Sequence, residues 1–369
     1  MLVLDDETLL VVQVKGKAIK IPGSDVEIGR LSKAIHDGIR QVKTLGRAVA
    51  AGQLTHVVSL RGVEIPLAAQ KNPRVIGMVV LDITNEAGIP RDLRPVILAG
   101  FDRVGSTPAH IFLRSTFEVL AKELDTLPDF LDYLDTREQL IERGVLNALT
   151  EELDFLALYK TNAPMVQEVF DGKITMLVIA EGTWEEHLKS GAEMRKKRDI
   201  ANQPSYLIDE MIDYFHIALG ERRPDDEVPP ATVEAYFATI SELGRLNRVE
   251  RRVMGEKIME KLASAKSKSV AYGLMADPKN KTAIFFLSTS KPRSERMIAV
   301  QNITRAAALH IGAKRILGIA TEPDGVQERT FDAVLVRDPQ ETPEDTAILL
   351  DLARTLFGPI RPFSRQEWE

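Results

Sequence analysis

Residues 9–16 read LLVVQVKG, in which four apolar residues lead into Gln13, Val14 and Lys15. Side chains of a β-strand alternate between two faces, so Gln13 and Lys15 share one face and Lys17 extends it. Val12 and Val14 are expected on the opposite face, packed against apolar neighbours. A short apolar run at 2–5 comes before this strand, and the polar turn at 5–8 predicts a hairpin between them.

A long amphipathic helix is predicted after this hairpin. Ser24 and Glu27 have the spacing of a capping box, which marks a helix start. Apolar residues then recur at helical spacing as far as Val49. The opposite face carries four cations: Lys33, Arg40, Lys43 and Arg47. This basic face is interpreted either as a solvated surface or as a surface that contacts nucleic-acid phosphates.

Composition limits the classes of protein to consider. The chain has 369 residues, more than one core usually serves, so two domains are expected. It has no cysteine, which excludes disulfides and thiolate chemistry. No apolar run reaches the roughly 18 residues of a membrane span, and no secretory signal is recognised, so a cytoplasmic location without membrane contact is expected.

Charge is unevenly distributed along the chain. The net charge is −6, but residues 1–114 hold 15 basic and 11 acidic residues, a balance of +4. Residues 115–185 hold 5 basic and 15 acidic residues, a balance of −10. A nucleic-acid surface is therefore expected in the N-terminal part, and a basic protein partner could bind the acidic region 115–185.

The order of predicted elements gives an α/β fold with a mixed β-sheet and flanking helices, and a second, smaller α/β domain. The first domain, 1–169, adds strands at 75–84 and 96–99 and an acidic helical extension at 115–169. The second, 170–369, begins with a short strand at 174–179 and helices at 184–199, 205–219 and 231–264. Strands at 270–275, 282–288, 316–320 and 331–336 follow, with helices at 293–311 and 342–357.

The hairpin ending in Gln13-Val14-Lys15, followed by a helix with a basic face, resembles the PD-(D/E)xK, or restriction-endonuclease-like, nucleases. The segment FLDYLDTREQL…EELDFLALY is also similar to the region after the nuclease core in some uncharacterised bacterial proteins of this kind. The resemblance implies a DNA-binding, metal-dependent phosphodiesterase using Mg²⁺ or Mn²⁺. It implies that Gln13 is a metal-site residue and that Lys15 orients the attacking water or stabilises developing charge. Lys17 and the basic helix face (Lys33, Arg40, Lys43, Arg47) would contact DNA.

The family pattern also requires an Asp on the first strand of the hairpin. If Leu4 faces Leu9 and Val3 faces Leu10, paired residue numbers sum to about 13, and the residue opposite Gln13 falls just before Met1. Asp5 and Asp6 lie at the turn, about 17 Å or more from Gln13 along the strand. Two explanations stand: the start codon is misplaced and an upstream segment carries the Asp, or the chain is a catalytically silent member.

Three alternatives remain open at the level of sequence. The strand with Gln13 and Lys15 could be an edge strand whose lysine discourages pairing, or could end in solvent. The chain could be a non-enzymatic scaffold or partner-binding protein. It could also be a small-molecule enzyme with a site at the strand end formed by Thr321, Glu322 and Asp324, since ligands often bind at carboxyl ends of α/β strands.

Overall fold

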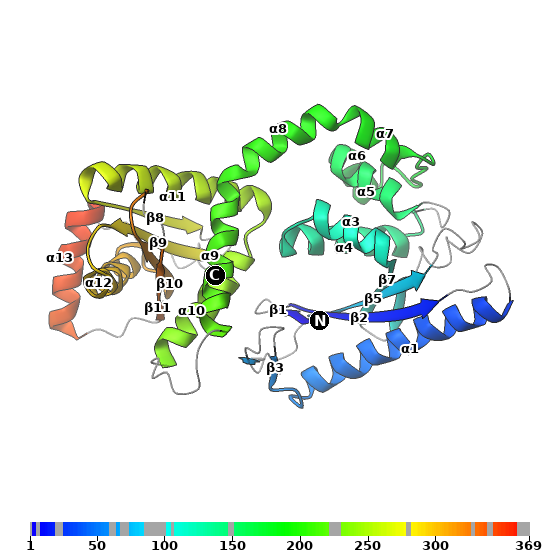
Figure 1. Cartoon of the computed structure of the whole chain (residues 1–369), viewed down its shortest axis with the longest axis horizontal. Helices are drawn as coiled ribbons and strands as arrows, with labels where there is room; N and C mark the ends of the chain where they lie inside the picture. Colours follow the sequence, from blue (N-terminus) through cyan, green and yellow to red (C-terminus); the bar gives the residue numbers. More distant parts are fainter. Residues whose placement is uncertain are drawn as a thin grey trace. The chain divides into compact units, whose positions relative to one another are not determined.

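The computed structural model divides the chain into two compact units, Met1–Ile200 and Ala201–Glu369 (Figure 1). The boundary lies later than the one expected after residue 169, because helices between 170 and 200 pack on the first unit. The structure describes residues 2–4, 8–18, 25–58, 64–66, 74–84, 101–104, 107–146, 151–220, 230–277, 282–325, 329–337 and 342–359.

The first unit is built on a mixed β-sheet. Its strands are β1 (Leu2–Leu4), β2 (Thr8–Ala18), β3 (His56–Val58), β4 (Glu64–Pro66), β5 (Arg74–Thr84), β6 (Phe101–Val104) and β7 (Thr107–Leu113). The main sheet has the order β1-β2-β5-β7-β6, while β3 and β4 pair separately. Strands β2, β5 and β7 run parallel, and β1 and β6 are antiparallel to their neighbours. The parallel centre explains why β5 is apolar on both faces.

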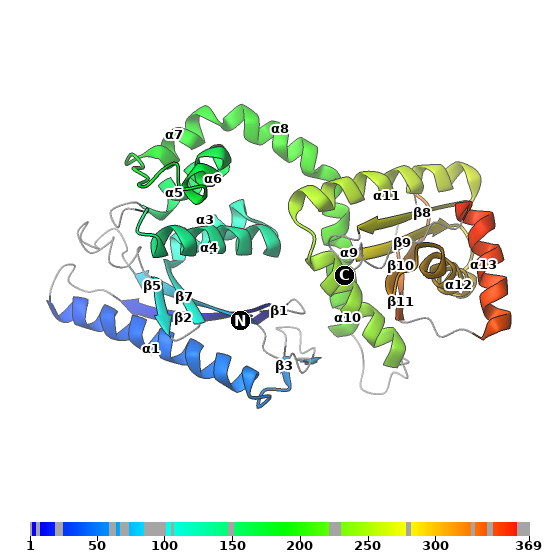
Figure 2. The ribbon, with the colours of Figure 1, turned by 180° about the vertical axis from the view of Figure 1, so that it is seen from behind.

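Helices cover both faces of this sheet (Figures 1 and 2). The helices of this unit are α1 (Asp25–Ala50), α3 (Arg114–Glu123), α4 (Leu127–Glu142), α5 (Glu152–Thr161), α6 (Ala163–Phe170), α7 (Thr183–Ser190) and α8 (Ala192–Asn202), the last of which crosses the boundary between the units. On one face, Leu9 and Val11 pack with Ile39 and Val42 of α1. On the other, residues such as Leu10 and Val12 share a core with α3, α4, α5 and α7. The first unit is therefore a three-layer α/β/α structure.

A glycine brings α1 close to the sheet. A Cβ added to Gly77 of β5 would lie 2.3 Å from Cγ1 of Val42. No side chain larger than hydrogen fits there unless Val42 shifts. The basic helix is therefore seated directly on the central strand.

The second unit has its own mixed sheet and helices. Its strands are β8 (Val270–Asp277), β9 (Thr282–Thr289), β10 (Arg315–Thr321) and β11 (Phe331–Arg337), in the order β11-β10-β9-β8. Strands β9 and β10 are parallel and the two outer pairs are antiparallel. The helices are α9 (Tyr206–Gly220), α10 (Pro230–Gly244), α11 (Arg248–Lys268), α12 (Arg293–Ile311) and α13 (Pro343–Phe357), with a short 3-10 turn, η2 (Gln203–Ser205).

Two apolar layers hold this unit together. Ile284 and Phe286 of β9 face a core shared with α9, α10 and α11. Phe285 and Leu287, which alternate with them, face a core shared with α12. The period of two along a strand thus separates the cores on the two sides of the sheet. The expected α/β class, with helices flanking β-sheets, is confirmed for both units.

Three sequence expectations need correction. The strand expected at 174–179 is reduced to a single bridge between Leu177 and Leu146. The helix expected at 184–199 is interrupted at Gly191, where the backbone ends α7 by bonding to the carbonyl of His187. The helix expected at 231–264 is two helices, because Asn247 begins α11 with a capping box. The strand expected at 96–99 lies outside the described residues.

A helix that crosses a bilayer needs about 20 mostly apolar residues, and the helices of the described part can be judged by that requirement. None is both long and apolar enough to cross a bilayer.

Candidate functional site

The expected hairpin register is confirmed. Leu4 pairs with Leu9, Val3 with Leu10, and Leu2 with Val11. Beyond Val11, strand β2 has β5 on one side and no described strand on the other. Gln13 and Lys15 therefore occupy an edge portion of β2, which agrees with one of the structural interpretations of this lysine.

Gln13 and Lys15 lie on the face of the sheet that α1 covers. Leu9 and Val11 point to α1, and alternation places residues 13 and 15 on the same side. Lys15 Nζ donates a hydrogen bond to Oε1 of Gln41 on α1, at 2.5 Å. Gln13 Nε2 instead donates to the carbonyl of Val14, at 3.1 Å. The two side chains share a face, but each is bonded to a different partner.

The opposite face of this strand end differs from the expectation. Val12 is buried as expected, but Val14 is 55% exposed. Strand β2 thus extends past the apolar core that covers its earlier residues. Lys17 belongs to the strand and pairs with Ile83, but its side chain lies outside the described part.

The described residues place no carboxylate beside Gln13 and Lys15. Asp82 of β5 pairs with Gly16, so its side chain lies on the other face of the sheet, where it forms an ion pair of 3.1 Å with Arg114. No group of three His, Asp or Glu side chains that could hold a metal occurs in the described part. Asp5 and Asp6 lie outside it. One amide oxygen is a poor ligand set for Mg²⁺, which is usually bound through carboxylates, so these residues do not fit a metal site.

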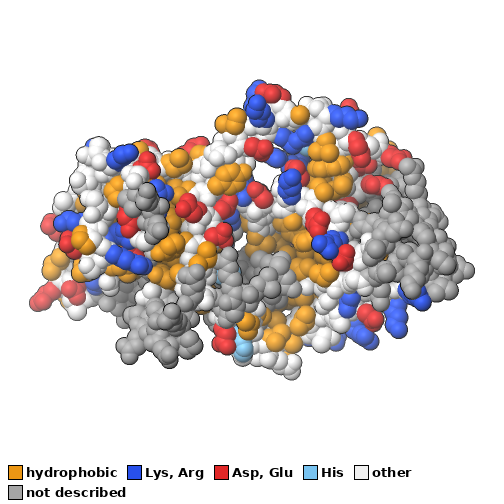
Figure 3. Space-filling model, viewed as in Figure 1, with side chains coloured by type: hydrophobic (Ala, Val, Ile, Leu, Met, Phe, Trp, Pro, Cys, Tyr) orange, Lys and Arg blue, Asp and Glu red, His pale blue; other side chains and the backbone are white. Residues whose placement is uncertain are grey.

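The four expected cations of α1 do lie on one helical face. Lys33, Arg40 and Arg47 are exposed and Lys43 is half-buried, whereas the opposite face of α1 is buried on the sheet. Figure 3 shows Lys and Arg side chains over the part of the surface formed by α1. Among the described residues, Arg40 alone of the four has an ion-pair partner, Asp37, at 3.0 Å. The pair is largely solvated, so it neutralises little of the basic face.

The acidic region 115–185 is partly internal. Asp154 is 5% exposed and accepts hydrogen bonds from the backbone N–H groups of Gly182 and Trp184. Glu152, also 5% exposed, accepts two bonds of 2.9 Å from Nε of Arg137. These two acidic residues are therefore buried and do not belong to the surface that a basic partner could reach. Their charge is used to hold helices together.

Sequence reasoning missed this buried network of the first unit. Arg137 of α4 is fully buried, and Glu152 also accepts a hydrogen bond from the hydroxyl of Tyr133. Burial raises the pKa of Tyr133 well above its ordinary value, and the charge of Glu152 adds to this. Burial, together with Arg137, holds the pKa of His110 well below its ordinary value. The network therefore joins α4, α5 and β7 with His110 neutral and Tyr133 protonated.

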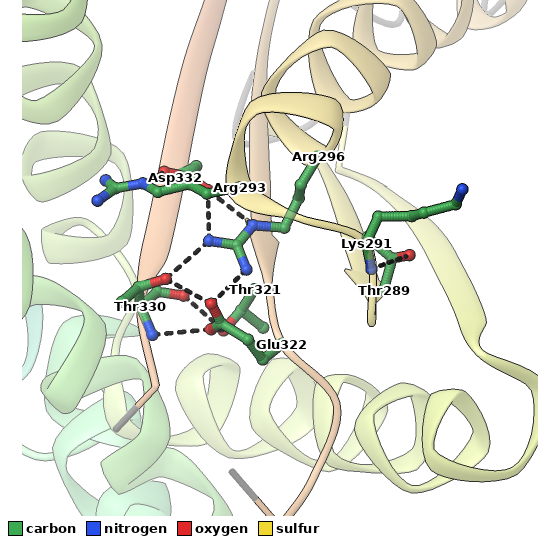
Figure 4. A network of polar contacts seen from close by, with 8 residues as sticks. All are labelled: Thr289, Lys291, Arg293, Arg296, Thr321, Glu322, Thr330 and Asp332. Carbon is green, nitrogen blue, oxygen red and sulfur yellow. Dashed lines mark hydrogen bonds and ion pairs between the residues drawn. The ribbon is translucent and has the colours of Figure 1, made fainter. Parts of the chain in front are cut away.

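A second network occupies the strand end where Thr321 and Glu322 were singled out (Figure 4). Arg296 of α12 is 1% exposed and bonds to three residues: Asp332 (2.7 Å), Glu322 (2.5 Å) and Thr330 (2.7 Å). Thr321 Oγ1 donates to the carbonyl of Thr330, at 2.7 Å.

The third residue singled out there, Asp324, is not part of this network. It lies 3.5 Å from Arg329. Every nitrogen of the Arg296 guanidinium has an internal partner, so we assign the network to joining α12 with the β10–β11 hairpin. Arg296 and Asp332 were missed because nothing in their sequence spacing marks them as a buried pair.

Comparisons with known proteins give no relative for this chain: no family model, no curated protein and no solved structure matches it.

Proposed function

We propose that the first unit binds nucleic acid, DNA in the first instance, through the phosphate backbone. The observation that carries the proposal is the basic face of α1: Lys33, Arg40, Lys43 and Arg47. Lysine and arginine supply most of the contacts that proteins make with phosphate oxygens. The opposite side of α1 is fixed on the sheet, so the cations are presented by a rigid element.

The spacing of the four cations suits an extended polyanion. Lys33 and Arg47 are 14 residues apart, which is about 21 Å along a helix that rises 1.5 Å per residue. Phosphates of duplex DNA supply one charge per about 1.7 Å of axis. A strand of phosphates can therefore meet several of these side chains at once.

The hairpin, the following helix and the parallel strand β5 also suit a restriction-endonuclease-like core, and this remains part of the proposal. Phosphodiester hydrolysis with Mg²⁺ or Mn²⁺ would rest on Gln13 and Lys15. Because the described residues do not fit a metal site, we derive no catalytic step and treat cleavage as an outcome to be measured.

The test is binding of a fluorescently labelled DNA duplex at several salt concentrations. The four α1 cations are changed together to glutamine. Binding that involves three or four phosphate contacts should give a log–log salt slope of about −3, and the variant should lose most of that slope.

A matched control carries the same change in charge at exposed lysines elsewhere: Lys189, Lys196, Lys257 and Lys268, each to glutamine. Equal loss of binding in both variants would show that total charge matters and not α1. Absence of binding by the wild type at low salt would refute the proposal. Adding Mg²⁺ or Mn²⁺ to wild type and Lys15→Ala, with plasmid DNA, tests cleavage separately.

A further inference from the structure

His187 of α7 interacts electrostatically with charged groups on three other helices. Glu123 lies at the end of α3, Lys160 at the end of α5, and Arg195 and Arg198 on α8. Lys160 Nζ forms an ion pair with the Glu123 carboxylate and also donates to the Glu123 carbonyl, at 3.2 Å. Arg198 Nη1 reaches the same carboxylate at 3.5 Å. The Glu123 carboxylate is thus shared by two cations.

The imidazole is fixed within this cluster. Its ring stacks on Trp184, with centroids 5.5 Å apart and planes 26° from parallel. Trp184 is 9% exposed and belongs to the core of the first unit. Nε2 of His187 is buried and has no hydrogen-bond partner among the described residues. The carbonyl of His187 accepts from Nη1 of Arg195, at 2.9 Å, which ties the start of α8 to the end of α7.

Charge around the ring opposes protonation. The groups that act on His187 are the cations Lys160, Arg195 and Arg198 and the anion Glu123. An imidazolium would be a fourth cation beside one carboxylate that is already engaged. It would also carry an N–H at the buried Nε2, where no described acceptor lies.

We propose that His187 is a pH-sensitive lock for the segment α7–α8, neutral when the segment is docked and protonated when it is released. This segment contains the covalent passage from the first unit to the second, since α8 spans the boundary after Ile200. Mild acidification therefore loosens the end of the first unit while its sheet stays folded.

The direction of the titration agrees with this geometry. Burial lowers the pKa of His187 below its ordinary value of 6.5, and Lys160 and Arg195 lower it further. Because the pKa of His187 is lower in the docked state than in the released state, the docked state binds fewer protons. Docking is therefore strongest above about pH 6.5 and weakens as the pH falls through the pKa of the docked form.

The experiment is hydrogen exchange of the full chain at pH 7.5 and 5.5, corrected for the intrinsic pH dependence of exchange. In the wild type, peptides covering 183–202 should lose several-fold more protection at pH 5.5 than peptides from β5. His187→Gln, which cannot titrate, should show the same protection at both pH values. His36→Gln, at an exposed histidine of α1, should behave as the wild type.

Two outcomes would overturn the proposal. One is unchanged wild-type protection of 183–202 on acidification, and the other is a pH effect that persists in His187→Gln. If that variant folds poorly, the NMR titration of the His187 ring in the wild type decides. A midpoint at or above 6.5 contradicts the lock, and a lower midpoint supports it.

Discussion

At the scale of single residues, Glu322 shows how a strand-end carboxylate becomes part of the fold. Burial alone would raise its pKa, but hydrogen bonds from Arg296 and Thr330 outweigh this and lower the pKa from 4.5 to about 2. The same side chain bonds the backbone N–H of Thr330, at 2.8 Å. From the sequence, Glu322 was one candidate for contact with a ligand. In the structure its charged side chain instead connects the end of β10 to Thr330, next to β11, and to Arg296 of α12.

The depressed pKa of Glu322 predicts that the free energy of unfolding falls in acid. A carboxylate with a depressed folded pKa contributes stability that is present above about pH 4.5 and is lost as the pH falls towards 2. The free energy of unfolding, measured with urea between pH 6 and pH 2.5, should fall less steeply for Glu322→Gln than for the wild type. Glu256→Gln, at an exposed residue of α11, should keep the wild-type slope. If the free energy of unfolding changed with pH in the same way for the wild type and Glu322→Gln, then Glu322 would contribute nothing to the pH dependence of stability.

At the scale of elements, the close packing of α12 on β10 depends on Gly318. A Cβ at this position would lie 2.0 Å from Oγ1 of Thr304, and Thr304 is itself bonded to the carbonyl of Val300. The helix and strand therefore approach as closely as the missing side chain permits.

Gly318→Ala should destabilise the chain by about 1–3 kcal/mol, the usual cost of overpacking a core. The matched control is Gly273→Ala on β8 of the same sheet, where the added Cβ meets Cε of Lys261 at an ordinary 3.6 Å. Urea unfolding compares the two variants. If Gly318→Ala costs no more than Gly273→Ala, then α12 does not pack on β10 as closely as described.

Elements were predictable from sequence where one pattern decided them. Helix α12 begins and ends at the residues that its apolar spacing indicated, and the register of the first hairpin followed from its turn. The break at Gly191 was missed because helical spacing continues across it. The exposure of Val14 was missed because alternation assigns a face but does not say how far that face is covered. The pair Arg137–Glu152 was missed because the sequence pattern of a charged residue in a helix is the same whether its side chain is exposed or buried, and most charged side chains are exposed.

At the scale of the whole molecule, the position of the boundary between the units can be argued from the contacts of the segment 170–200. Leu177 and Trp184 are buried in the core of the first unit. Asp154, buried on α5, depends on the backbone N–H of Trp184, at 2.7 Å, to satisfy its charge. Cutting the chain after residue 169 would remove these side chains and leave a buried carboxylate without those partners.

The residues 1–200 should therefore unfold in one cooperative transition, whereas 1–169 should unfold at a lower temperature or fail to fold. Burial of one large apolar side chain stabilises a fold by about 1.5–3 kcal/mol. The total free energy of unfolding of a domain is only about 5–15 kcal/mol, so the loss of one or two such side chains matters. Within 1–200, Trp184→Ala should cost about 3–5 kcal/mol, while Met194→Ala, at a side chain 73% exposed, should cost little. Circular dichroism melts measure all four chains. Equal midpoints for 1–169 and 1–200 would place the boundary at residue 169, because the segment 170–200 would then contribute nothing to the core that it contacts.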